Sequence, residues 1–246
     1  MFDHVTIRVP DLEEARRFYG TALAVLGHGE PAADEHFFEW GDLSIAAARP
    51  DRPVTRRTHV ALAARSTEQV DAFWRAATEA GFRDNGAPGP RPRYHEGYYG
   101  AFVLDPSGNN IEAVNHGFET PNMIDHVFIR VADLDASRKF YETVLEPLGQ
   151  GVWATGNEPG GDEWVGLGAR GGSLWVSEGE PTENLHLAFG APGNGTVEEF
   201  HRTALGAGYE DNGPPGERPR YHPGYYGAFV LDPDGNNVEA VCHNRD

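Results

Sequence analysis

Two histidines and one glutamate occur twice in this chain, at matching places in two similar stretches of sequence. They are His4, His59 and Glu112 in the first stretch, and His126, His186 and Glu239 in the second. Imidazole nitrogens and carboxylate oxygens are common ligands of divalent metals, and a set of two histidines and one carboxylate leaves coordination positions open. The residue types and their spacing therefore predict metal-dependent chemistry at two similar sites.

The two sets correspond because the chain contains an internal repeat. Its best-matched segments are DHVTIRVPDLEEARRFY (3–19) with DHVFIRVADLDASRKFY (125–141), and YHEGYYGAFVLDPSGNNIEAVNH (94–116) with YHPGYYGAFVLDPDGNNVEAVCH (221–243). Self-similarity of this kind determines the domain organisation before secondary structure is considered. We predict two domains, at residues 1–118 and 123–246.

The repeats differ in length at one place. His4 and His126 are 122 positions apart, whereas His59 and His186 are 127 positions apart, so the second repeat has five additional residues. They fall in the Gly-rich stretch GVWATGNEPGGDEW, residues 151–164. Such an insertion predicts a lengthened loop or hairpin at the rim of a site.

The composition excludes several classes of partner. The chain of 246 residues has 38 acidic and 20 basic side chains, which gives a formal net charge of −18. This charge repels phosphate backbones and anionic lipid surfaces, so we expect neither nucleic acid nor a membrane as a partner. A single cysteine, the lack of a signal-peptide pattern and the lack of a long apolar stretch predict a cytoplasmic protein. We expect a small-molecule substrate as the partner. We expect the protein to be either a monomer with an internal pseudo-dimer or a homodimer.

The hydrophobic pattern predicts a unit of one strand, one helix and two or three further strands, which occurs four times. In the first repeat the expected strands are 2–9, 37–40, 43–48, 58–64, 98–104 and 110–115, and the expected helices are 11–26 and 66–81. Asp11 and Ser66 are the predicted N-caps of these helices. The alternation of elements predicts an α+β fold.

Strand periodicity predicts where the metal-competent side chains point. Alternate side chains of a strand face opposite sides, and His4, His59 and Glu112 each alternate with apolar residues that can pack on a helix. The Asp-Pro-Ser-Gly turn at 105–108 favours a tight hairpin that specifies the register of the glutamate strand. We therefore expect these side chains on the helix-free face of a sheet.

The grouping of the six residues has two solutions. In one, His4 shares a site with His59 and Glu112, and the second repeat keeps its own three residues. In the other, modules are exchanged, so that His4 joins His186 and Glu239.

These segments resemble the vicinal oxygen chelate superfamily, which includes glyoxalase I, extradiol ring-cleaving dioxygenases, and fosfomycin and bleomycin resistance proteins. The resemblance is carried by His4 in DHVTIRV, His59 in HVALA and Glu112 in DPSGNNIEAV, and by their counterparts. It implies two tandem domains, each of two βαβββ modules that form a cupped sheet around a divalent metal. The best guess for that metal is Fe(II), with Mn, Ni, Co or Zn as alternatives.

The resemblance implies a metal-dependent enzyme that acts on a small vicinal-oxygen substrate, either dioxygenase-like or glyoxalase-like. The alternative is a small-molecule-binding or antibiotic-binding resistance protein on the same fold. Ring-cleaving relatives have a tyrosine ten residues before the glutamate, where this chain has Phe102 and Phe229. Strands 43–48 and 173–177 lack the acidic ligand that glyoxalase I usually adds.

Four further residues are the predicted catalytic groups. They are His95, His222, Tyr99 and Tyr226. A histidine titrates near neutral pH and can move protons near a bound substrate, and a tyrosine can donate a hydrogen bond to a substrate oxygen. His116 and His243 lie on the same strand face as the glutamate and are expected at the rim of the site.

Overall fold

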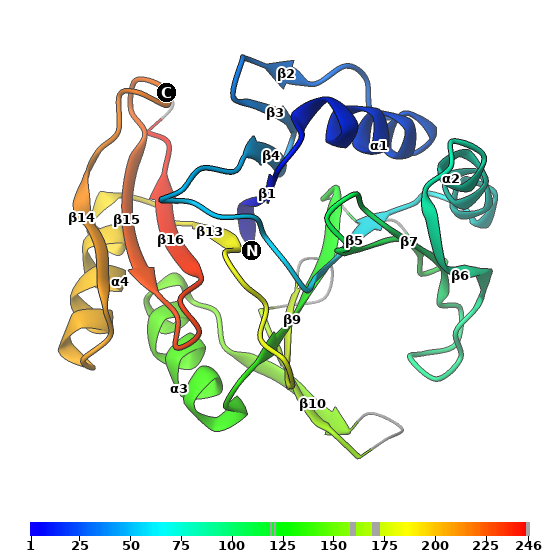
Figure 1. The fold of residues 1–246 in the computed structure, drawn as a ribbon. Helices are drawn as coiled ribbons and strands as arrows, with labels where there is room; N and C mark the ends of the chain where they lie inside the picture. Colours follow the sequence, from blue (N-terminus) through cyan, green and yellow to red (C-terminus); the bar gives the residue numbers. More distant parts are fainter. Residues whose placement is uncertain (119, 121, 158–160, 169–172, 245–246) are drawn as a thin grey trace. The chain divides into compact units, whose positions relative to one another are not determined.

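The computed structural model describes residues 1–118, 120, 122–157, 161–168 and 173–244. The chain forms two compact units (Figure 1). Unit 1 comprises Met1–Val5 and Ile129–Asp246, and unit 2 comprises Thr6–Phe128. Each unit thus includes the first residues of the other repeat, so the units divide the chain differently from the boundaries that we predict from the repeat. Parts of the predicted join (119 and 121), of the insertion (158–160) and of the second domain's end (245–246) lie outside the described residues.

The first repeat contains the elements that its hydrophobic pattern predicts, together with two short or irregular strands. Its elements are β1 (Phe2–Val9), α1 (Leu12–Val25), β2 (Ala32–Ala33), β3 (Phe37–Trp40), β4 (Leu43–Ala47), β5 (Thr58–Ala63), α2 (Thr67–Glu79), β6 (Arg83–Pro90), β7 (Tyr99–Leu104) and β8 (Asn110–Asn115). The additional strands are β2, which has only two residues, and β6, whose Gly- and Pro-rich sequence is atypical of a strand.

The second repeat contains the corresponding elements. They are β9 (Ile124–Val131), α3 (Leu134–Leu145), a 3₁₀ turn (Glu146–Leu148), β10 (Val152–Asn157), β11 (Glu163–Leu167), β12 (Ser173–Glu178), β13 (His186–Gly190), α4 (Asn194–Gly206), β14 (Asp211–Glu217), β15 (Tyr226–Leu231) and β16 (Asn237–Cys242). The Gly-rich stretch that contains the insertion includes β10 and the start of β11, which pair antiparallel as a hairpin.

Helices α1, α2 and α3 start where a side chain accepts hydrogen bonds from the first turn. Asp11 accepts from the backbone N–H groups of Glu13 and Glu14, and Ser66 accepts from that of Gln69. Within unit 2, helix α1 packs against α2; within unit 1, helix α3 packs against α4 (Figure 1). The predicted N-caps are confirmed.

The strands described here form two eight-stranded sheets. Their hydrogen-bonded orders are β14-β15-β16-β13-β1-β4-β3-β2 and β10-β11-β12-β9-β5-β8-β7-β6. In both orders the first strand of one repeat, β1 or β9, lies beside a strand of the other repeat, β13 or β5. This exchange decides which of the chemically important residues meet.

The tight turn before β8 sets the direction of its side chains. Gly108 has a positive φ of 86° and its N–H donates to the carbonyl of Asp105, as the Asp-Pro-Ser-Gly sequence predicts. The β7–β8 register then pairs Val103 with Ile111 and Phe102 with Glu112. Because Ile111 is completely buried on the helix side, its neighbour Glu112 points to the opposite face.

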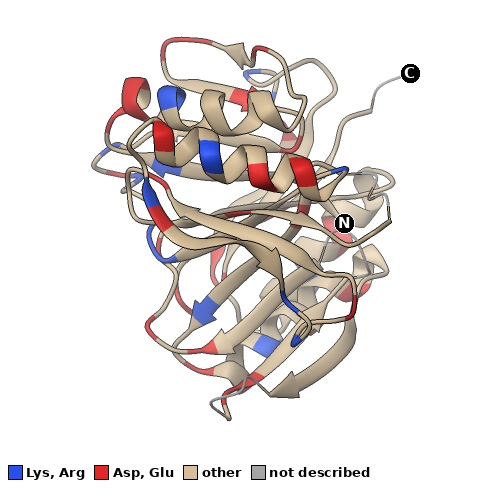
Figure 2. Cartoon of the chain, turned by 90° about the vertical axis from the view of Figure 1, so that its right-hand side faces the viewer, with Lys and Arg blue, Asp and Glu red and all other residues tan. Residues whose placement is uncertain are grey.

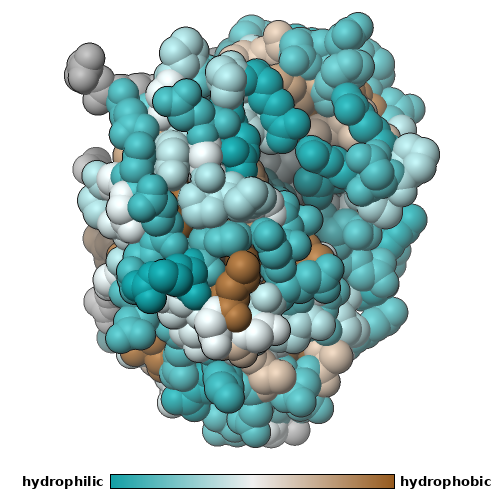
Figure 3. All heavy atoms as spheres, turned by 90° about the vertical axis from the view of Figure 1, so that its left-hand side faces the viewer, coloured by the Kyte–Doolittle hydropathy of each residue, from teal (hydrophilic) through white to brown (hydrophobic). Residues whose placement is uncertain are grey.

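The outer surface has the character that the composition predicts. Acidic side chains outnumber basic ones along the chain (Figure 2), and the face in Figure 3 is mainly hydrophilic with small, separated hydrophobic patches. In the described part of the chain, every helix is too short or too polar to cross a membrane.

Candidate metal centres

The metal-competent residues form two clusters, one in each unit. The unit 1 triad is His4, His186 and Glu239, and the unit 2 triad is His59, Glu112 and His126. In each triad the candidate ligand atoms lie within 4.8 Å of one another. The grouping that keeps three residues of one repeat together is therefore wrong, and the exchanged grouping is observed.

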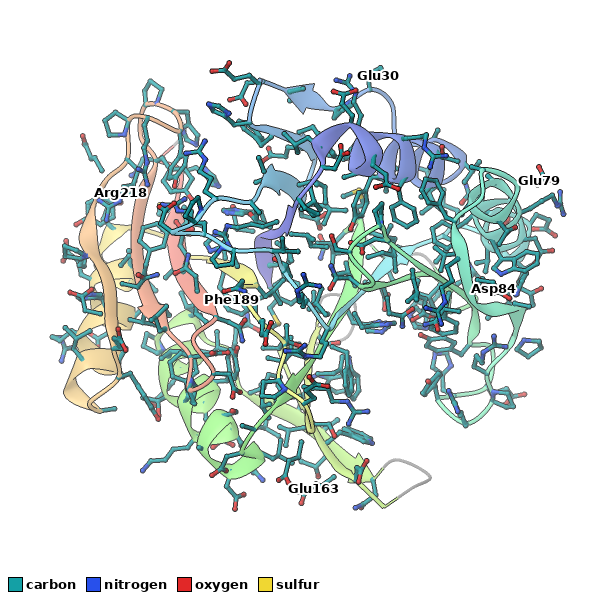
Figure 4. All side chains as sticks on the ribbon, in the orientation of Figure 1. Glu30, Glu79, Asp84, Glu163, Phe189 and Arg218 are labelled. Atoms are coloured by element: carbon teal, nitrogen blue, oxygen red, sulfur yellow. The ribbon has the colours of Figure 1, made fainter. Side chains whose placement is uncertain are left out.

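The exchange has a local structural cause. In unit 1, the N–H of Gly190 donates to the carbonyl of Met1, and the rings of Phe2 and Phe189 stack 5.5 Å apart, which holds the start of β1 beside β13 (Phe189 is labelled in Figure 4). In unit 2, the N–H of Ala63 donates to the carbonyl of Met123 just before β9.

The geometry of the two triads is nearly the same. In unit 2 the Nε2 atoms of His59 and His126 are 3.3 Å apart, and they lie 3.1 Å and 3.7 Å from Oε2 of Glu112. In unit 1 the Nε2 atoms are 3.1 Å apart, and those of His186 and His4 lie 3.1 Å and 3.8 Å from Oε2 of Glu239. Two imidazole nitrogens and one carboxylate oxygen therefore converge on one point in each unit.

A buried tyrosine holds the second oxygen of each carboxylate. The hydroxyl of Tyr98 donates to Oε1 of Glu112 at 2.6 Å, and that of Tyr225 donates to Oε1 of Glu239 at 2.7 Å. Burial, followed by the charge of the carboxylate, raises the pKa of both phenols, so each remains a donor. The side chain of Glu112 is only 1% exposed, and a Cβ atom at Gly100 would collide with its Oε1. The glycine thus makes room for the carboxylate.

The two histidines of a triad have different partners behind them. Nδ1 of His126 lies 2.7 Å from a carboxylate oxygen of Asp125, whereas Nδ1 of His59 meets the side-chain amide of Asn110. Burial lowers the pKa of His59, and the hydrogen bond and charge of Glu112 only partly offset this effect. Burial acts on His126 in the same direction, but Asp125 and Glu112 outweigh it and raise the pKa.

Unit 1 repeats this asymmetry. His4 meets Asp3 at 2.8 Å and His186 meets Asn237 at 2.6 Å. A carboxylate or amide behind a metal-binding imidazole fixes the orientation of the ring. These supporting residues did not emerge from our sequence interpretation, although Asp-His and Asn-Asn pairs recur in both repeats.

The predicted catalytic tyrosines do not reach the triads. The hydroxyl of Tyr99 donates to Asp71 at 2.8 Å, and that of Tyr226 donates to Glu198 at 3.0 Å. Strand parity is the reason, because Tyr99 follows Tyr98 directly and must face the other side. Tyr98 is the residue that contacts the triad, and the same parity argument could have selected it.

The predicted catalytic histidines bind a second histidine. Nε2 of His95 lies 2.8 Å from Nδ1 of His116, and Nε2 of His222 lies 2.8 Å from Nδ1 of His243. The connection of each pair to a triad runs through an aspartate rather than through direct contact.

A phenylalanine borders each triad on the strand next to the glutamate. The ring of Phe102 lies 6.0 Å from that of His59, and the guanidinium of Arg91 lies 5.5 Å from the centre of the Phe102 ring. Phe229 has the same neighbours in unit 1, His186 and Arg218, the latter labelled in Figure 4. The position opposite the glutamate therefore offers an apolar surface rather than an acidic proton.

The described α+β fold thus places in each unit a largely buried cluster of two histidines and one carboxylate that could hold a metal ion. A family model, the Glyoxalase/Bleomycin resistance protein/Dioxygenase superfamily, matches residues 1–113 and again residues 123–240. The chain belongs to this family, and the match covers both repeats.

Similarity to a solved glyoxalase I structure supports the fold. Glyoxalase I from Zea mays is 21% identical, with a TM-score of 0.73, over 98% of this chain and 92% of that chain. A glyoxalase/bleomycin resistance protein from Albidiferax ferrireducens is 33% identical over 46% of this chain and 98% of its own, with a TM-score of 0.41. A variant of homoprotocatechuate 2,3-dioxygenase from Brevibacterium fuscum is 19% identical over 98% of this chain and 70% of that chain, with a TM-score of 0.42. A search of curated proteins returned no match.

Proposed function

We propose that the chain is a metal-dependent enzyme with one mononuclear metal centre in each unit. The observation that carries this proposal is the convergence of two Nε2 atoms and one Oε2 atom within 4.8 Å in both triads. A buried carboxylate that is only 1% exposed needs a positive partner, and a divalent cation between these atoms would supply it. The donor set therefore fits a divalent metal.

His4, His186 and Glu239 would hold the metal of unit 1, and His59, Glu112 and His126 would hold that of unit 2. When bound, the metal would act as a Lewis acid toward vicinal substrate oxygens or, as Fe(II), would support oxygen chemistry. Tyr98 and Tyr225 keep the carboxylates oriented through Oε1. The apolar rings of Phe102 and Phe229 limit water beside one histidine of each triad.

Fe(II) is our preferred metal because two histidines and one carboxylate with open positions are the ligand set of many mononuclear iron oxygenases. The substrate is a small molecule with two adjacent oxygen atoms. Ring cleavage of catechols is disfavoured, because Phe102 lies opposite Glu112 and has no proton to transfer. Glyoxalase-like isomerisation is therefore the other reaction to test.

The decisive assay compares substrate classes in protein loaded with Fe(II) or with Ni(II). Oxygen uptake is measured with catechols, 2-hydroxy ketones and thiol adducts of carbonyl compounds, and isomerisation of the adducts is followed without oxygen. Metal-dependent turnover of one class supports an enzyme. Tight substrate binding without turnover at any metal would instead support a small-molecule-binding resistance protein, for which intact triads are unnecessary.

A further inference from the structure

A chain of four hydrogen bonds leads from the unit 2 triad to the loop before β7. Nδ1 of His126 lies 2.7 Å from Oδ1 of Asp125, and Oδ2 of Asp125 lies 2.9 Å from Nε2 of His116. Nδ1 of His116 lies 2.8 Å from Nε2 of His95, whose Nδ1 lies 2.6 Å from the carbonyl oxygen of Glu96. Three imidazoles and one carboxylate are thus connected in series.

Unit 1 contains the same chain in the same order. His4 meets Asp3 at 2.8 Å, Asp3 meets His243 at 2.7 Å, and His243 meets His222 at 2.8 Å. Nδ1 of His222 lies 2.7 Å from the carbonyl oxygen of Pro223. The arrangement therefore does not depend on the loop residue that supplies the final carbonyl.

The number of protons in this chain follows from its hydrogen bonds. Each of the four bonds contains one hydrogen, and the terminal carbonyl can only accept, so Nδ1 of His95 is protonated. Three neutral imidazoles would supply only one hydrogen each, so the four bonds require one additional proton. Its positive charge equals the negative charge of Asp125, and the connected group as a whole is neutral.

Neighbouring side chains shield this hydrogen-bonded chain from water. The side chain of Asp125 is 6% exposed and that of His116 is 12% exposed. The ring of Tyr98 meets the rings of both His116 and His95 edge-on, at 5.1 Å and 5.4 Å.

The end of this hydrogen-bonded chain at the triad determines what the hydrogen-bonded chain can do. A neutral His126 ring with its hydrogen on Nδ1 would have an unprotonated Nε2, and this atom points at His59 and Glu112. A metal on Nε2 would end the chain there, so protons have no onward path through the ring. The geometry therefore favours a positioning role over proton transfer.

We propose that His95 and His116 share one additional proton, neutralise Asp125, and through it hold His126 in the form whose Nε2 can bind a metal. His222 and His243 do the same for His4 through Asp3. This inference rests on the proposed function, since it concerns the same two metal centres. All four histidines are positioning residues, because they act on the triads through an aspartate.

The proton count is tested by nitrogen-15 NMR of histidine-labelled, full-length protein with Zn²⁺ at neutral pH. The expected result is that three of the four ring nitrogens of His95 and His116 are protonated, with the same count for His222 and His243. Two protonated nitrogens in each pair would overturn the inference, whether or not zinc is bound.

The positioning role is tested by Co²⁺ affinity in a Glu239→Gln background, where only the unit 2 triad is complete. His116→Asn should weaken Co²⁺ binding at least about tenfold, as loss of a partner behind a ligand usually does. His95→Gln, on a half-exposed loop residue, should weaken it less and provides the readout if His116→Asn fails to fold. His36→Gln, an exposed histidine outside the chain, is the matched control and should bind normally.

Failure of the positioning role can be distinguished from failure of the proposed function. Unchanged Co²⁺ affinity in both His116→Asn and His95→Gln would contradict the positioning role while leaving the metal centre intact. A parent protein that binds no Co²⁺ would instead contradict the proposed function.

Discussion

The two triads agree in geometry, whereas the hairpins that follow the first helix of each repeat differ. His59 and His186 each lie 3.1 Å from their glutamate, yet β2 has two residues where β10 has six. Trp164 of the longer hairpin also contacts Trp175 of the neighbouring strand β12, with ring centres 4.9 Å apart. The triads, their tyrosines and their aspartates thus form a set that is independent of these hairpins.

The hydrogen-bonded chains behind the two triads, hereafter the supporting chains, differ in their exposure to solvent. The side chain of His116 is 12% exposed and stacks on Phe118 at 5.3 Å, whereas that of His243 is 31% exposed. The unit 2 chain is therefore better shielded from water. Matched substitutions in the two units can show how much this difference matters.

The largest expected effect comes from removing one carboxylate charge. Glu112→Gln should abolish metal binding in unit 2 and leave one metal equivalent per chain, and Glu239→Gln should do the same for unit 1, because each triad has one carboxylate. Metal analysis of the purified variants measures this. Loss of both equivalents in either single variant would contradict independent centres.

A smaller effect is expected when a carboxylate loses its tyrosine. Tyr98→Phe leaves Oε1 of Glu112 buried without that donor, which should cost about 1–3 kcal/mol of unfolding free energy. Tyr99→Phe is the matched control, since it removes a hydrogen bond at the surface and should change stability by less than about 0.5 kcal/mol. Urea unfolding measures both, and equal effects would count against the different roles of the two tyrosines.

A third comparison concerns the buried turn carboxyl of Asp105, whose counterpart is Asp232. Burial raises the pKa of Asp105 above 3.8, despite hydrogen bonds from Asn109 and Tyr19. The folded protein thus binds this proton more tightly than the unfolded chain does. The resulting stabilisation is complete below pH 3.8 and is lost as the pH rises through the folded-state pKa.

Asp105→Asn removes this titration. The stability of the parent protein relative to this variant should therefore fall as the pH rises from below 3.8, by about 1.4 kcal/mol for each unit of pKa shift. Unfolding curves at a series of pH values measure the difference, and Asp232→Asn should behave alike. A difference that grows with pH would have the wrong sign.

The smallest expected effect separates the two supporting chains. His116→Asn and His243→Asn both remove a hydrogen bond to an aspartate, and each should cost about 1 kcal/mol of unfolding free energy. The loss should be greater for His116, because its aspartate is more deeply buried at 6% exposure, against 18% for Asp3. Unfolding of the metal-free variants tests this order, and a larger loss for His243 would reverse it.

The sequence predicts the elements well where the local signals agree. Asp11 and Ser66 cap helices, and the turn at 105–108 directs Glu112 to the correct face. Strand β6 was missed because its sequence, RDNGAPGP, has the Gly and Pro content of a loop, and its pairing with β7 is interrupted by register shifts.

The sequence predicts the residues of the site better than their connections. All six triad residues follow from the repeat, but which repeat supplies each one depends on long-range strand pairing, which local periodicity does not encode. Tyr99 was chosen over Tyr98, although strand parity places Tyr98 on the face of Phe102, which lies opposite Glu112. The link from His95 to His126 joins residues 31 positions apart through Asp125, so spacing alone could not reveal it.

The central claim, that each triad holds one divalent metal, is tested most directly by anomalous diffraction from crystals grown with Fe(II) or Zn²⁺. The account predicts two peaks per chain, each about 2.0–2.2 Å from two Nε2 atoms and one carboxylate oxygen of a triad. Metal peaks only at other positions, or triads without a peak at saturating metal, would contradict the central claim.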